Sequence, residues 1–185
     1  IGVAPDGTPT LPIDRGYWIP KNGRWVMADY DYDAAYISVL NDNSDGYFIP
    51  TIKMLKAAKR HGFPDMQSYH IETLAASIIP GTVDYFKKQN WAVSYPSLIY
   101  NFLLRCVDDV LKVAHLPGSK SPIADGYMSP TRKQELSNLF RAWANYCEEV
   151  FRMSDADAVK GWGKIFGSPF PVAPVSTAEI LYGGR

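Results

Sequence analysis

The chain has 185 residues and a mass of 20.7 kDa, and 46% of its residues are hydrophobic and 14% aromatic, which is enough for one sizeable core. Its 19 basic side chains balance 19 acidic ones, so net charge gives no reason to expect nucleic acid or an anionic membrane as a partner. No apolar run reaches the roughly 18 residues of a membrane helix, and no signal-peptide pattern is visible. Two cysteines exclude a disulfide-built scaffold and suit a reducing compartment. Together these observations predict a soluble, cytoplasmic protein.

The first 30 residues are predicted to form a β segment. Two runs rich in aromatic and β-branched residues, Tyr17–Ile19 and Arg24–Met27, are separated by a stretch that contains Asn22–Gly23. Asn-Gly is a preferred sequence for tight hairpin turns, so this pattern predicts a β-hairpin.

Helical periodicity begins at Asp31, and capping residues, prolines and glycines divide it into six predicted helices. Pro80–Gly81 is expected to end the third helix and Pro117–Gly118 to follow the fourth. The predicted helices span residues 33–41, 50–62, 68–79, 96–115, 130–151 and 155–166. The expected fold class is therefore α+β and mostly α. It has a β segment over residues 1–30, a helical bundle over 31–171 and a C-terminal tail over 172–185.

The second predicted helix carries a basic stripe. Lys53, Lys56 and Arg60 follow one another at three- and four-residue steps, so they share one helical face. Three cations on one stripe suit a polyphosphate ligand. The alternative is a solvated basic face opposite the core.

The third predicted helix begins close behind this stripe, with Ser68 as its expected N-cap. A helix N-terminus presents free backbone N–H groups and the positive end of the helix dipole, which suit an anion. Ser68 adds a hydroxyl donor, and Tyr69 adds a ring on which a base can stack. The alternative is an ordinary capped helix, but the two patterns in succession point to a phosphate site.

No residue of the chain is predicted to be catalytic or to bind a metal. Asp29, Asp31 and Asp33 alternate, and we interpret them as acidic residues that lead into a helix, where its dipole favours them. Cys106 and Cys147 lie on apolar helix faces without further ligands at metal-binding spacing, so they are predicted to be buried free thiols.

Several short motifs, taken in order, resemble one known family. They are Gly16–Pro20 with Trp25, Ile49–Lys56, Ser68–Leu74, Tyr127–Pro130 and Trp162–Pro171. In this order and spacing the chain resembles the second half of bacterial nucleotidyltransferases that make cyclic oligonucleotide signals in phage defence. These enzymes are relatives of oligoadenylate synthase and cyclic GMP-AMP synthase. The similarity covers nearly all of residues 1–171.

The resemblance implies a polymerase-β-like enzyme in which two lobes enclose a nucleoside triphosphate. The first lobe carries a Gly-Ser turn and an Asp-x-Asp pair that holds two Mg²⁺ ions. The helical second lobe supplies a Lys and a Ser to the phosphates and a ring to the base, which correspond here to Lys56, Ser68 and Tyr69. With Lys53 and Arg60 these form the expected nucleotide-binding set. Mg²⁺ is expected only together with the missing N-terminal catalytic lobe, which the resemblance makes a partner of this chain.

The chain departs from the family pattern in its metal ligands. It contains no Gly-Ser turn followed by Asp-x-Asp, and Gly2 occupies the position of the third metal-binding Asp. Two hypotheses follow: the chain is the helical lobe of a nucleotidyltransferase, or it is a catalytically degenerate nucleotide-binding or protein-interaction module. The resemblance also implies that a ubiquitin-like conjugation enzyme acts on the C-terminus, which ends Gly183–Gly184–Arg185. The alternative there is an inert extension.

Overall fold

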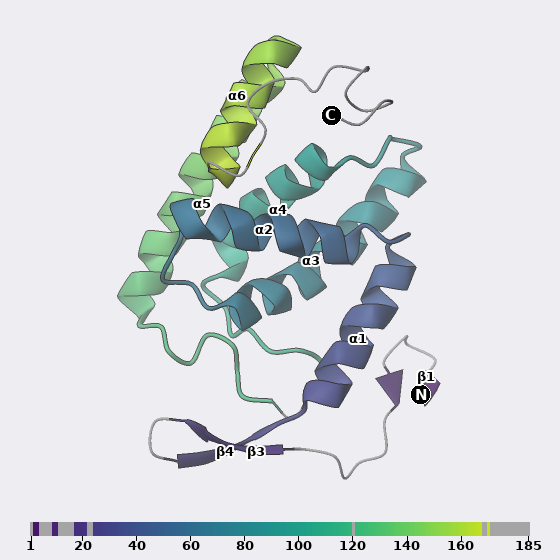
Figure 1. Cartoon of the computed structure of the whole chain (residues 1–185), viewed down its shortest axis with the longest axis vertical. Helices are drawn as coiled ribbons and strands as arrows, with labels where there is room; N and C mark the ends of the chain where they lie inside the picture. The colour runs from purple at the N-terminus through teal and green to yellow at the C-terminus, as the bar shows by residue number, and fades with distance from the viewer. Residues whose placement is uncertain are drawn as a thin grey trace, which may run out of the picture.

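The computed structural model describes residues 2–3, 9–10, 17–21, 24–119, 121–167 and 170, and it is mostly helical (Figure 1). β1 (Gly2–Val3) and β2 (Pro9–Thr10) form a short antiparallel pair. β3 (Tyr17–Lys21) and β4 (Arg24–Ala28) form the predicted hairpin, with Tyr17 opposite Ala28. Its turn, together with the C-terminal tail, lies outside the described residues.

Within the described residues, six helices follow the hairpin. They are α1 (Tyr30–Asn43), α2 (Phe48–Gly62), α3 (Ser68–Lys88), α4 (Tyr95–Asp109), α5 (Pro130–Phe151) and α6 (Asp155–Phe166). In each of the last two helices a serine side chain caps the N-terminus. Ser129 Oγ accepts a hydrogen bond from the N–H of Arg132 at 3.2 Å, and Ser154 Oγ accepts one from Asp157 at 3.4 Å. The mostly helical class and the number of helices are therefore as predicted.

Two predicted helix ends are wrong. α3 continues through Pro80–Gly81 to Lys88, because its apolar face also continues: Ile79 and Val83, on either side of the proline, are fully buried. Burial of that face offsets the backbone hydrogen bond that a proline removes inside a helix.

α4 stops at Asp109, six residues earlier than predicted. Just beyond this end, the backbone N–H of Ala114 donates to Asp125 Oδ1 at 3.0 Å, and its carbonyl accepts from the N–H of Ala124 at 2.7 Å. These long-range bonds occupy the backbone groups that a longer helix would need.

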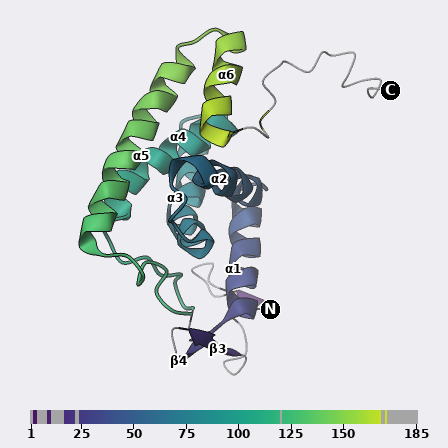
Figure 2. The same ribbon diagram turned by 60° about the vertical axis from the view of Figure 1, so that its left-hand side comes forward.

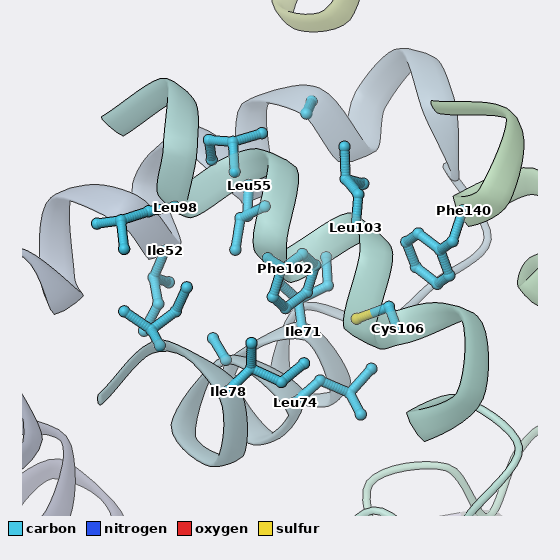
Figure 3. Packing of buried hydrophobic residues seen from close by; sticks show 14 of the residues in the cluster. Ile52, Leu55, Ile71, Leu74, Ile78, Leu98, Phe102, Leu103, Cys106 and Phe140 are labelled. Atoms are coloured by element: carbon cyan, nitrogen blue, oxygen red, sulfur yellow. The ribbon is translucent and has the colours of Figure 1, made fainter. Parts of the chain in front are cut away.

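The core lies where α4 packs between α3 and α5. Phe102 of α4 is fully buried, with Leu55 of α2 and Ile71 of α3 in the same cluster (Figure 3). Phe140 of α5 meets Phe102 edge to face at 6.3 Å between ring centroids. Each such buried side chain contributes roughly 1.5–3 kcal/mol to folding.

The two ends of the molecule differ in character. α6 lies beside the C-terminal part of α5 at one end, and the β3–β4 hairpin lies at the other, next to the start of α1 (Figure 1, Figure 2).

No described helix is long and apolar enough to cross a membrane. Cys106 and Cys147 are buried free thiols, as predicted, and burial raises the pKa of Cys147 to about 12.

Candidate functional site

A pocket of about 630 Å³ opens between the first three helices, the hairpin and the loop that precedes α5. This volume is in the range of small-molecule sites. Its aliphatic wall consists of Ile19, Ile37, Ile49, Ile52, Leu116 and Pro122. Its polar groups come mainly from facing positions on α2 and α3.

The wall formed by α2 presents two lysines. Lys53 and Lys56 lie one turn apart and both line the pocket, because the buried residues Leu55 and Ala58 fix the other side of the helix in the core. Within the described part of the chain, no acidic side chain forms an ion pair with Lys53. Lys56 does have a partner: its Nζ contacts Glu72 Oε1.

The wall formed by α3 presents Tyr69 and Glu72, which also lie one turn apart. A residue of the loop before α5 fixes the start of this helix: Tyr127 Oη accepts a hydrogen bond from the backbone N–H of Gln67 at 2.7 Å. Gln67 takes the N-cap position that was predicted for Ser68, and Ser68 is the first helical residue. The predicted cap is therefore wrong by one residue.

A buried carboxylate forms the floor next to Tyr69. Asp33 is 9% exposed and accepts hydrogen bonds from Ser119 Oγ at 2.5 Å and Ser121 Oγ at 2.8 Å. These bonds tie the first turn of α1 to the loop that carries Leu116. The hydroxyl of Tyr69 is buried beside this cluster, and burial together with the charge of Asp33 raises the pKa of Tyr69 to about 12.

Three of the five predicted binding residues meet in this pocket: Lys53, Lys56 and Tyr69. Arg60 and Ser68 are exposed and do not line it. The sequence interpretation placed Asp33 correctly in the first turn of a helix but did not anticipate its burial or its serine partners. No local pattern reveals that contact, because the serines lie 86 and 88 residues away.

The pocket does not fit a pair of magnesium ions. Such a site needs several oxygen ligands that are free to bind the metal. Here Asp33 accepts from two serines and Glu72 is paired with Lys56. Among the described residues, no three His, Cys, Asp or Glu side chains converge.

Comparison of the chain with protein-family models finds no match, and comparison with curated proteins finds none either. The ligand is therefore inferred from the chemistry of the pocket. The pocket combines an aliphatic wall, an aromatic ring and two ammonium groups, so it suits a molecule with a flat apolar part and an anionic part.

Proposed function

We propose that the chain is the nucleotide-binding helical lobe of a nucleotidyltransferase. This enzyme makes cyclic di- or oligonucleotide second messengers from nucleoside triphosphates in anti-phage signalling. In this proposal the helices of the chain form the second lobe of a polymerase-β-like enzyme. The two Mg²⁺ ions are held by the catalytic lobe, since the residues described here do not fit them.

The observation that carries the proposal is the convergence of Lys53, Lys56 and Tyr69 on one pocket. Lys53 and Lys56 belong to the basic stripe on α2 and Tyr69 to the start of α3, and these three side chains line the same space. In this function Lys53 and Lys56 contact the phosphates as charge-assisted donors. The ring of Tyr69 stacks on the base, and the aliphatic wall excludes water from it.

Isothermal titration calorimetry of the pure chain with ATP, GTP, CTP and UTP tests this proposal. We expect at least one triphosphate to bind, and we expect the Lys53→Ala/Lys56→Ala variant to lose that binding. Lys59→Ala is the matched control, because Lys59 lies on the same helix but does not line the pocket. No heat from any of the four nucleotides, or equal loss in the control, contradicts the proposal.

A protein-interaction module is the second candidate, and the hairpin favours it. Trp18 and Trp25 are 61% and 67% exposed, and exposed aromatic side chains are enriched at protein interfaces. Under this alternative, the chain binds no nucleotide. A Trp18→Ser/Trp25→Ser variant then folds normally and no longer associates with its partner in sedimentation experiments.

A further inference from the structure

Lys56 and Glu72 come from neighbouring helices, line the same pocket and contact each other. On α2 the pocket is lined by Lys53 and Lys56, and on α3 by Tyr69 and Glu72. Each pair is separated by three residues, so each lies on one helical face. The second members of the two pairs form an ion pair. One of the two cations expected to receive phosphate is thus already neutralised in the ligand-free chain.

The positive and negative side chains that line the whole pocket are equal in number. Its lining contains two lysines and two carboxylates, Asp33 and Glu72. The two carboxylates are held differently, because Asp33 accepts hydrogen bonds from two serine hydroxyls and is nearly inaccessible. The side chain of Glu72 is 27% exposed and that of Lys56 is 37% exposed. Ion pairs with this degree of exposure hold weakly, so the Glu72 carboxylate is the group that an incoming anion displaces.

We propose that Glu72 is an internal competitor for phosphate at Lys56, an inference that rests on the proposed nucleotide-binding function. A polyphosphate that binds Lys56 competes with the Glu72 carboxylate for its ammonium group. After displacement that carboxylate remains next to the bound phosphates and repels them. Glu72 therefore sets the affinity of the pocket for polyanions below the value that its two lysines alone would give.

The Glu72→Gln variant separates charge from shape. Glutamine has nearly the same size as glutamate, and its side-chain oxygen still accepts a hydrogen bond from Lys56 Nζ. We expect this variant to bind ATP and inorganic tripolyphosphate about tenfold more tightly than the unmodified chain, the effect of removing one negative charge within several ångströms of the phosphates. The gain should be clearly smaller when Glu72→Gln is introduced into the Lys56→Ala variant, because only the repulsion of the phosphates is then removed and no ammonium group is released.

Calorimetry with both ligands on all variants is the test, with circular dichroism as the check on folding. Glu149→Gln is the matched control: it removes the same charge from an exposed position on α5 that does not line the pocket, and it should leave both affinities unchanged. If Glu72→Gln binds no more tightly, or gains as much without Lys56, the competitor role is wrong, whether or not ATP binds. If tripolyphosphate binds and Glu72→Gln strengthens it through Lys56 while no nucleoside triphosphate binds, the competitor role stands and the proposed function fails. If neither ligand binds to any variant, both fail.

Discussion

Lys56 is the residue at which phosphate recognition is most directly tested. We expect Lys56→Ala to weaken triphosphate binding by about 1–3 kcal/mol, the range for losing a charged hydrogen-bond partner. Helix content should not change, because alanine is the best helix former, and Glu72 remains partly exposed to water once it is unpaired. Calorimetry and circular dichroism on the same sample measure both. Unchanged affinity with a lower melting temperature would show that Lys56 is a structural residue.

His70 gives a prediction about stability and pH. It is fully buried, and desolvation lowers the pKa of its imidazole from 6.5 to about 4. Between these two values the unfolded chain binds a proton and the folded chain does not, so the free energy of unfolding falls as the pH drops from about 6.5 towards 4. We expect a loss of about 1–3 kcal/mol across this window and no contribution above it.

Urea unfolding at pH 7.5 and pH 5 measures this loss. The His70→Gln variant should show a smaller difference between the two pH values, whereas His61→Gln, at an exposed position, should keep the full difference. An unchanged pH dependence in His70→Gln would assign the effect to other groups.

Residue types and spacing predicted only part of the pocket. The steps between Lys53 and Lys56 fix a shared helical face from the sequence alone. The roles of Glu72 and Asp33 depend on what lies opposite them, which is Lys56 on another helix and two serines on a distant loop. Such contacts follow from tertiary packing, and a single sequence carries no local signal for them.

Two helical glycines give opposite predictions at the level of elements. A Cβ atom at Gly161 of α6 would lie 2.7 Å from Val150 Cγ2 of α5, whereas one at Gly81 of α3 would meet nothing within 4 Å. We expect Gly161→Ala to destabilise the protein by about 1–3 kcal/mol through overpacking. Gly81→Ala should stabilise it by about 0.5–1 kcal/mol through helix propensity. Thermal unfolding of both variants decides this, and destabilisation by Gly81→Ala would show that α3 needs a flexible residue after Pro80.

Helix starts were easier to predict than helix ends. Ser129 and Ser154 act on backbone groups three residues away, so the whole signal is local. The end of α4 depends instead on Asp125, which binds the N–H of Ala114 across 11 residues. Pro80 is a strong local stop signal, but burial of the surrounding apolar face overrides it. Local signals therefore fail where long-range contacts contribute more free energy.

At the level of the molecule, the pocket is assembled from five segments. Its lining extends from Ile19 in the hairpin to Pro122 in the loop before α5. Periodicity predicted that six helices follow a hairpin, but it did not predict which of their faces meet. The arrangement leaves the two lysines and Tyr69 around one space while the carboxylates there are already occupied. The pocket thus offers two ammonium groups and an aromatic ring to a ligand, while its carboxylates are not free to hold metal ions.

Because the cations of the pocket are available to a ligand and its carboxylates are not, we expect the chain to bind nucleoside triphosphates but to make no product from them. Two-metal phosphoryl transfer requires carboxylates that hold the ions, activate the attacking hydroxyl and neutralise developing charge. In this pocket Asp33 is bonded to two serines and Glu72 is paired with Lys56. We expect no new spot on a thin-layer chromatogram after incubation with four labelled triphosphates and Mg²⁺ or Mn²⁺, while calorimetry of the same sample shows binding. A metal-dependent product that disappears in the Lys53→Ala/Lys56→Ala variant would contradict this expectation, because it would place the chemistry in this chain.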